Sequence, residues 1–201
     1  MHIAIEGMDG VGKTTVAHEL AQRLGFRVIE KPLQHLFEGA GGLDTYLRCR
    51  DWVNNQAQNA PLRAWFYGLG NLYLLDRFRG ENIVTDRHLV SNYYWCGVES
   101  TETLFRCLVE LAGSPDLTVL LCATPEVGAQ RLRTRALDDS DLPKTALYVE
   151  SVAKMRAFLE RFEMKHLTID TSELTPAQVV DIIVAALPST SQAATGTGAS
   201  R

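Results

Sequence analysis

Short, continuous apolar runs recur along the chain, separated by longer stretches in which apolar residues return every three or four positions. The runs are Ile3–Ile5, Phe26–Ile29, Ile83–Thr85, Leu117–Cys122 and Leu167–Ile169. Apolar runs of this kind are typical of strands covered on both faces, and the helical stretches between them supply crossover connections. The pattern therefore predicts an α/β fold with a doubly wound five-stranded parallel sheet flanked by helices.

The stretches between the runs predict the helices. The first is expected to begin near Lys13 and to end at Gly25, a residue that readily adopts the left-handed conformation found after a last helical turn. Further helices are expected over residues 61–77, 102–112, 125–135, 145–162 and 176–187. Three of them begin at a proline, which is tolerated in a first turn because the N–H there has no helical partner.

Length and composition predict one domain. A chain of 201 residues with 46% hydrophobic residues can bury one sizeable core, which we place over residues 1–187. Residues 188–201 are mainly Ser, Thr, Ala and Gly without apolar periodicity. Burial cannot offset the entropy lost on ordering such a segment, so we expect a disordered tail.

Charge and hydropathy exclude several classes of protein. A net charge of -4 argues against a general nucleic-acid binder, which needs clustered Lys and Arg. No window reaches the roughly 18 apolar residues of a membrane span, and no basic segment precedes the first apolar run. The four cysteines form no CxxC pair. We expect a cytoplasmic protein without a nucleic-acid or membrane partner.

Residues 7–14, Gly-Met-Asp-Gly-Val-Gly-Lys-Thr, match the pattern GxxxxGK[ST] between the first predicted strand and the first predicted helix. The pattern predicts a P-loop NTPase type of fold that binds ATP. Lys13 is expected to bridge the β- and γ-phosphates, and the Thr14 hydroxyl to ligate Mg²⁺. The residues assigned to the nucleotide are Gly7, Gly10, Val11, Gly12, Lys13, Thr14 and Thr15. The alternative is a glycine-rich turn that contains Lys and Thr by chance, and the strand–turn–helix context argues against it.

A P-loop does not by itself distinguish a kinase from a switch GTPase or a mechanical ATPase. The GTPase reading lacks a guanine-reading NKxD tetrapeptide. Later segments are more informative, and they occur in the order and spacing of one family. They are Thr85-Asp86-Arg87-His88, then Ser91-Asn92 and Trp95, and then Pro115-Asp116-Leu117-Thr118 and Pro125-Glu126-Val127-Gly128.

Together with Glu6–Thr15, these segments resemble the thymidylate kinase family over nearly residues 2 to 187. The resemblance implies an ATP- and Mg²⁺-dependent nucleoside monophosphate kinase and a homodimer. It also implies that Asp9 contacts the acceptor sugar or organises the metal. A carboxylate in a phosphate cradle repels phosphates unless metal or acceptor hydroxyls match it, which makes Asp9 a functional candidate on chemical grounds as well.

Two charged residues end the third predicted strand, beside the P-loop strand. Asp86 can hold Mg²⁺ or its waters, and Arg87 can grip the acceptor phosphate through two N–H groups. The alternative is a simple ion pair at a strand end.

Three arginines follow the proline of the 125–135 helix. On one continuous helix Arg131 and Arg135 share a face, whereas Arg133 points roughly opposite. The acidic run after the helix continues it poorly, so we expect a mobile lid over about residues 133–145. A lid arginine would neutralise charge on the transferring phosphoryl group. A solvated basic helix face is the alternative.

Aromatic residues on the 61–77 helix offer a surface for the acceptor base. The resemblance assigns base stacking to Phe66, whereas core packing is the preferred interpretation for Trp65 and Tyr73. It also places Trp95 beneath the acceptor sugar, where bulk can exclude a ribose 2′-hydroxyl. Trp95 fits a simple core position equally well.

The chain departs from the family at three places. Gly70 stands where the family has an arginine that reads the thymine edge, and Glu30-Lys31-Pro32 stands for an Arg-Glu-Pro, so Lys31 is a candidate phosphate ligand. Neither Gly10 in the P-loop nor Asp139-Ser140 in the lid supplies the family's transition-state arginine. Arg133 and Arg135 are the expected substitutes, and pyrimidine choice would then rest on Asn92 and cavity shape.

Three functions follow as hypotheses. The first is a nucleoside monophosphate kinase that phosphorylates dTMP or a related pyrimidine deoxynucleotide to the diphosphate. The second is a deoxynucleoside kinase that phosphorylates a 5′-hydroxyl with Glu30 as the base. The third is a non-enzymatic, nucleotide-responsive binding protein.

Overall fold

The computed structural model describes residues 1–37, 42–57 and 59–188, so the expectation for the tail beyond Pro188 lies outside the described residues. The five predicted strands pair in one parallel sheet in the order β2-β3-β1-β4-β5. Their bounds are β1 His2–Glu6, β2 Arg27–Glu30, β3 Ile83–Asp86, β4 Leu117–Cys122 and β5 His166–Asp170. The prediction of a doubly wound five-stranded parallel sheet is confirmed.

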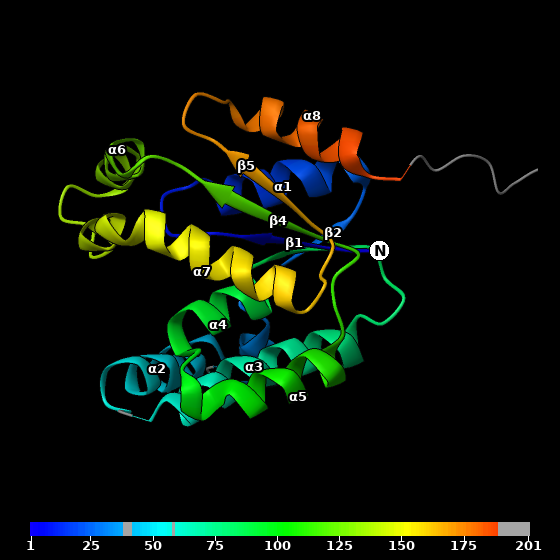
Figure 1. Ribbon diagram of the computed structural model, residues 1–201, viewed down its shortest axis with the longest axis vertical. Coiled ribbons are helices and arrows are strands. Elements are labelled where there is room, and N and C mark those ends of the chain that lie inside the picture. Colours follow the sequence, from blue (N-terminus) through cyan, green and yellow to red (C-terminus); the bar gives the residue numbers. More distant parts are fainter. Residues whose placement is uncertain (38–41, 58, 189–201) are drawn as a thin grey trace, which may run out of the picture.

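Helices cover both faces of this sheet (Figure 1). The α-helices are α1 Lys13–Leu24, α2 Gly42–Asn55, α3 Ala60–Arg77, α4 Leu89–Cys96, α5 Glu102–Ala112, α6 Pro125–Arg135, α7 Tyr148–Arg161 and α8 Pro176–Ala186. Three 3₁₀ helices are described: η1 Pro32–Phe37, η2 Glu99–Thr101 and η3 Leu142–Leu147. Helices α1 and α8 lie on one face, and α4, α5 and α7 lie on the other.

Local sequence signals explain most of these bounds. Gly25 ends α1 at φ 69°, as predicted for a left-handed cap. Thr124 and Thr175 accept hydrogen bonds from the first turns of α6 and α8, in which Pro125 and Pro176 need no partner. Helices α2 and α4 were not predicted, because α2 buries only two side chains within the described range and α4 is short and apolar on nearly every side.

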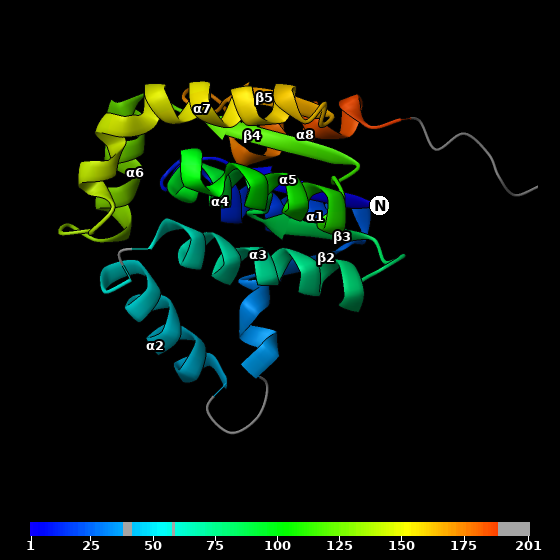
Figure 2. The ribbon, with the colours of Figure 1, turned by 60° about the horizontal axis from the view of Figure 1, so that its bottom comes forward.

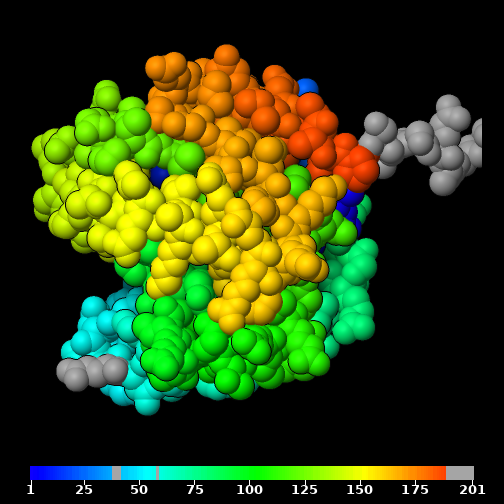
Figure 3. Space-filling view, in the orientation of Figure 1, coloured from blue at the N-terminus to red at the C-terminus, as the bar shows by residue number. Residues whose placement is uncertain are grey.

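The core lies mainly between the sheet and its covering helices. Fully buried Ile3, Ile5 and Leu120 from the central strands belong to the same cluster as Phe105 of α5 and Phe158 of α7. A second small cluster joins α3 to the β2–β3 edge. Figure 2 shows that α3 lies between α2 and the sheet. Figure 3 shows that α2 and the 125–147 segment project from the same edge of the molecule.

The register of the central strands brings two motifs together. Ile5 of β1 pairs with Asp86 of β3, so the P-loop and the Asp86-Arg87 segment leave the sheet side by side at its carboxyl edge. In open parallel sheets this edge, at the point where strand order reverses, is where ligands bind.

Candidate active site

The P-loop connects β1 to α1 through three glycines with positive φ: Gly7 at 135°, Gly10 at 85° and Gly12 at 95°. A Cβ on Gly7 would lie 2.3 Å from the carbonyl oxygen of Leu121, so only glycine fits there. Gly12 is the N-cap of α1, and no side chain of the described residues caps this helix. The first N–H groups of α1 therefore remain available to a phosphate.

Gly10 lies beneath α6 and the start of α7. A Cβ at this position would be 2.8 Å from Tyr148 Oη and 3.0 Å from the Gly128 carbonyl oxygen. The Tyr148 hydroxyl donates to the backbone carbonyl of Asp9, which ties the start of α7 to the P-loop. A long side chain at position 10 would break this packing, which explains why no arginine occupies the P-loop.

Lys13 is buried, with a side chain only 6% exposed. Its Nζ donates to the Met8 carbonyl at 2.7 Å and lies 3.7 Å from Asp9 Oδ1. Burial and the nearby Arg87 charge lower the pKa of Lys13 to about 8, although Asp9, Asp86 and Glu6 oppose them.

Asp9 and Arg87 form an ion pair at the mouth of the P-loop. The same guanidinium donates to the Gly7 carbonyl at 3.1 Å and to Ser91 Oγ at 3.0 Å. Burial raises the pKa of Asp9, but the charges of Arg87, Lys13, Lys144 and Arg135 outweigh it and hold that pKa below its ordinary value. Asp9 is therefore a carboxylate surrounded by cationic side chains, and it is these cations that could bind phosphate.

Thr14 and Asp86 offer two oxygen ligands for a divalent cation. Thr14 Oγ1 donates to Asp86 Oδ2 at 2.5 Å. The other carboxylate oxygen, Asp86 Oδ1, is buried and has no hydrogen-bond partner among the described residues. One hydroxyl and one carboxylate with a free oxygen fit Mg²⁺, which takes its remaining ligands from phosphates and water.

A cavity of about 690 Å³ extends from the P-loop, within the roughly 300–1,000 Å³ range of small-molecule sites. The predicted residues that line it are Asp9, Gly10, Val11, Gly12, Lys13, Thr14, Thr15, Lys31, Asp86, Arg87 and Arg135. Arg131 also lines it, held by hydrogen bonds to the side chain and backbone of Thr171. The expectation that Arg131 and Arg135 share one face of α6 is confirmed.

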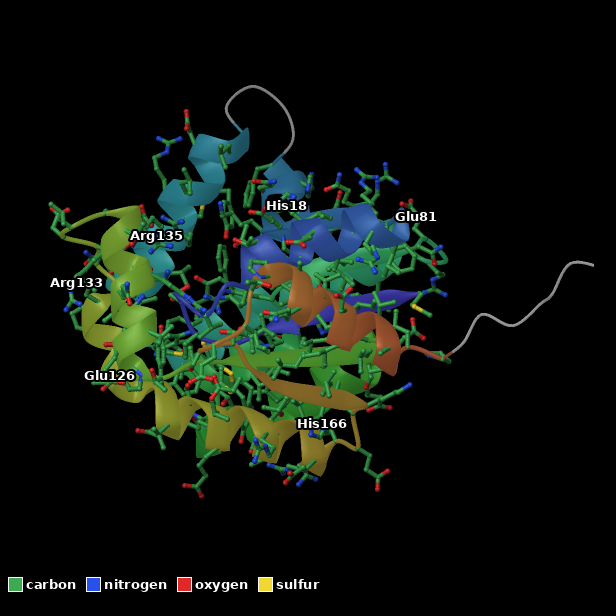
Figure 4. All side chains as sticks on the ribbon, turned by 90° about the horizontal axis from the view of Figure 1, so that it is seen from above. His18, Glu81, Glu126, Arg133, Arg135 and His166 are labelled. Atoms are coloured by element: carbon green, nitrogen blue, oxygen red, sulfur yellow. The ribbon has the colours of Figure 1, made fainter. Side chains whose placement is uncertain are left out.

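Arg133 lies apart from this group. It is exposed, is not among the residues that line the cavity, and lies at the outer edge of the molecule in Figure 4. Arg135 reaches the cavity, yet its guanidinium is already paired with Asp139 at 2.6 Å and Asp141 at 2.8 Å. The structure thus separates the two arginines that the sequence suggested as substitutes.

The ends of β2 and β3 carry two further candidates. Lys31 and Arg87 are non-glycine residues with positive φ, 45° and 77°. Such backbone conformations are costly and concentrate at functional sites. Glu30 lines the cavity, and its Oε1 lies within hydrogen-bond distance, 2.6 Å, of His18 Nε2.

The residues assigned to the acceptor base lie beyond this cavity, between α3 and α4. Phe66 stacks on Tyr46 of α2, with ring centroids 6.5 Å apart and an interplanar angle of 7°. Asn92 is buried and donates to the Ala64 carbonyl at 3.0 Å, while its Oδ1 has no partner among the described residues. Trp95 is 40% exposed, so it is not a simple core residue.

Gly70 and the neighbouring α3 residues show how this region differs from the family pattern. Gly70 is buried, and a Cβ there would lie 3.1 Å from Leu33 and 3.2 Å from Pro32 of η1. The helix η1 therefore covers the place from which an arginine would reach the base. One α3 residue not identified from the sequence is Arg63, whose buried Nε has no partner among the described residues. Trp65 is 46% exposed, so the expectation of core packing is wrong for it.

Comparison with known proteins identifies the family. The thymidylate kinase profile matches residues 72–183, more than half of the 201 residues. The chain belongs to the thymidylate kinase family. It is a nucleotide-binding phosphotransferase, which removes the non-enzymatic hypothesis.

Relatives of this member of the thymidylate kinase family are named as kinases of different nucleotides. A cytidylate kinase of Chlamydia trachomatis serovar L2 is 24% identical over 217 residues, covering 94% of this chain and 99% of the relative. A probable thymidylate kinase of Archaeoglobus fulgidus is 29% identical, covering 86% and 88%. The fold matches a deoxyadenosine kinase from M. mycoides with the products dCMP and dCDP bound, at a TM-score of 0.63, 16% identity, and coverage of 92% and 97%.

Glu6 of this kinase has a structural role that no pattern in the sequence predicts. Its fully buried carboxylate accepts hydrogen bonds from the backbone N–H groups of His88, Val90 and Ser91 at 2.8, 3.1 and 3.2 Å, and from the Ser91 hydroxyl. His88, the N-cap residue of α4, does not cap this helix with its own side chain in the structure described. Glu6 therefore replaces the cap and fixes the segment that carries Arg87.

Replacing Glu6 by Ala is expected to destabilise the protein by about 3 kcal/mol, because several buried N–H donors lose their acceptor. Glu6→Gln keeps one acceptor oxygen and should cost less. Thermal unfolding of both variants measures the effect. A melting temperature of Glu6→Ala equal to that of the wild type would contradict the capping role.

Proposed function

We propose that this protein is an ATP- and Mg²⁺-dependent nucleoside monophosphate kinase that converts dTMP, or a related pyrimidine deoxynucleotide, to the diphosphate. The observation that carries the proposal is the position of Arg87. Its guanidinium is presented beside the P-loop through the contacts to Gly7, Ser91 and Asp9, at the entrance to the phosphate cradle. A planar fork of N–H donors is suited to a phosphate that the acceptor already carries.

In the proposed reaction an anionic oxygen of the acceptor phosphate attacks the γ-phosphorus of ATP. A new P–O bond forms as the bond to the β–γ bridging oxygen breaks, and ADP leaves with that electron pair. The acceptor oxygen already carries negative charge, so no general base is required. The work of the protein is positioning and charge stabilisation, by the P-loop N–H groups and Lys13 on ATP and by Arg87 on the acceptor.

Thr14 and Asp86 are the residues that would hold Mg²⁺. The cation would neutralise charge on the β- and γ-phosphates and help to orient them. Asp9 would then accept hydrogen bonds from the acceptor sugar, and its negative charge would be balanced by Lys13 and Arg87 at either side.

The base site is proposed to use stacking and a small number of polar atoms. Phe66 supplies the aromatic face, Trp95 the wall near the sugar, and Asn92 Oδ1 an acceptor that has no partner in the described part of the chain. Buried polar atoms without partners require a ligand or water. Arg63, on the same helix as Phe66, also has a buried Nε without a partner among the described residues.

A second candidate function is phosphorylation of a deoxynucleoside. Glu30 favours it, because a carboxylate at the cavity wall near the carboxyl end of β2 can take a proton from a 5′-hydroxyl. The two functions make opposite demands on Glu30 and Arg87. A nucleoside acceptor needs the carboxylate base, whereas a monophosphate acceptor needs the guanidinium.

Oligomeric state and location complete the proposal. Helix α3 exposes Leu62, Trp65 and Leu69, which are 42%, 46% and 48% exposed and recur at helical spacing on one face. A second copy of the chain that covers this face would give the homodimer that the family resemblance implies.

The described residues include no helix with the length and hydropathy of a membrane span. We propose action in the cytoplasm, where ATP and nucleoside monophosphates are present.

The acceptor specificity gives a prediction. With Mg²⁺ and ATP, we expect turnover of dTMP and appreciable turnover of at least one other pyrimidine deoxynucleoside monophosphate. Stacking and shape discriminate between bases by only about 1–3 kcal/mol, whereas a site built on paired hydrogen bonds discriminates more sharply. Initial rates with dTMP, dCMP, dUMP, dAMP and dGMP measure this. Turnover of one monophosphate alone, at more than about 10⁴-fold over the rest, would contradict a base site of this kind.

A further inference from the structure

Phosphoryl transfer develops negative charge on the transferring group, and a cation that meets this charge is normally worth several orders of magnitude in rate. Three positions near the P-loop do not supply such a cation. Position 10 has no room for a side chain, Arg131 is tied to Thr171, and the two carboxylates that pair with Arg135, Asp139 and Asp141, both lie outside the P-loop. Arg133 lies on the outer surface.

Lys144 of η3 is a cation of the lid that reaches the P-loop. Its Nζ lies 4.0 Å from Asp9 Oδ2 and 2.6 Å from Asp141 Oδ1. The same ammonium lies 5.5 Å from the centre of the Trp95 ring, within cation–π distance. Lys144 therefore lies between the carboxylate of the phosphate cradle and the aromatic ring assigned to the acceptor sugar.

Neighbouring contacts keep Lys144 in this place. Pro143 restricts the backbone immediately before it, and Tyr148, four residues later, is bonded to the Asp9 carbonyl. Thr145 Oγ1 also donates to the Leu142 carbonyl at 2.9 Å, which closes the turn. The end of the lid is thus anchored to the P-loop on the side where Lys144 projects.

We propose that Lys144 is a catalytic residue that supplies the cation for the transferring phosphoryl group. On binding of ATP and acceptor, its ammonium exchanges the Asp9 and Asp141 carboxylates for non-bridging oxygens of the γ-phosphoryl group. It donates hydrogen bonds and transfers no proton, so the bonds formed and broken are those of the reaction above. The long, flexible stem of lysine allows this exchange without movement of η3. The inference rests on the proposed phosphoryl transfer, but it does not depend on which acceptor is used.

The test compares Lys144→Met, Lys144→Arg and Lys165→Met with the wild type. Methionine retains much of the side-chain length without charge, and Lys165 is an exposed lysine on the turn before β5. We expect kcat of Lys144→Met to fall by about 10²-fold or more while the Kd for ATP changes little. Lys144→Arg should recover a large part of this loss, and Lys165→Met should behave as the wild type.

Each result decides between the proposals. A kcat of Lys144→Met within about threefold of the wild type would overturn the role of Lys144 while the kinase assignment stands. A fall in kcat that Lys144→Arg does not reduce would also overturn it, because charge would then not be the property required. If the wild type phosphorylates only nucleosides, the same variants measured with a nucleoside still test Lys144, and only the acceptor assignment fails. A wild type that transfers phosphate to no acceptor would overturn both.

Discussion

Replacing Lys13 by Ala is expected to reduce kcat by about 10³-fold or more while the protein remains folded. The buried ammonium donates to the Met8 carbonyl and lies 3.7 Å from Asp9 Oδ1. Its loss leaves Asp9 with the charges of Arg87 and Lys144, so the carboxylate stays compensated. Steady-state kinetics measure the rate, and circular dichroism with thermal unfolding measures the fold.

Lys165→Ala is the matched control, because it removes a lysine from an exposed position. A folded Lys13→Ala protein with unchanged turnover would remove the mechanistic basis of the P-loop assignment.

The protonation of Lys13 also predicts a pH dependence of the reaction. Since the pKa of Lys13 is lowered to about 8, the free enzyme loses this cation as pH rises through that value. We therefore expect kcat/KM for ATP to decline above about pH 8 in the wild type.

Replacing Arg87 by Ala is expected to damage the use of monophosphates selectively. The bidentate, charge-assisted contact to an acceptor phosphate in a partly dry site is worth several kcal/mol, so kcat/KM for dTMP should fall by about 10²–10⁴-fold. Activity with thymidine, if the wild type has any, should change far less because thymidine carries no phosphate. Arg87→Lys should be intermediate, since it retains the charge but not the planar fork.

Arg106→Ala is the control for this substitution, because Arg106 is exposed on α5, away from the residues that line the cavity. The variants are compared by kcat/KM for dTMP and for thymidine at one fixed concentration of ATP and Mg²⁺. Normal phosphorylation of dTMP by Arg87→Ala would show that the acceptor phosphate is bound elsewhere, and Lys31 would become the first residue to examine.

The sheet could be predicted from the sequence because its signals are local. Strands buried on both faces read as continuous apolar runs, and the capping residues at Gly25, Thr124 and Thr175 mark where helices stop and start. Helix α4 escaped prediction because nearly all its residues are buried, so no polar face gives it a period. The P-loop was predictable for a similar reason, since its residues are contiguous in the sequence.

The remaining parts of the candidate site depend on contacts between distant segments. Glu6 lies next to the P-loop in sequence, but its role appears only when the His88–Ser91 backbone folds against it. Lys144 belongs to a segment that Tyr148 holds over the P-loop through its hydrogen bond to the Asp9 carbonyl. No periodic pattern in the sequence predicts this hydrogen bond. The positions of the arginines after Pro125 and the resemblance to the family suggested Arg133 and Arg135, but the ion pairs with Asp139 and Asp141 show that Arg135 is already engaged.

The acceptor is the central claim, and one measurement tests it most directly. Wild-type protein is incubated with Mg²⁺ and ATP and either dTMP or thymidine, and the products are separated by anion exchange to give kcat/KM for each acceptor. We predict formation of dTDP from dTMP, with kcat/KM at least about 10²-fold above that for thymidine, because Arg87 binds a phosphate that thymidine lacks. Formation of dTMP from thymidine, with no phosphorylation of dTMP itself, would contradict the account and assign Glu30 the role of base in a nucleoside kinase.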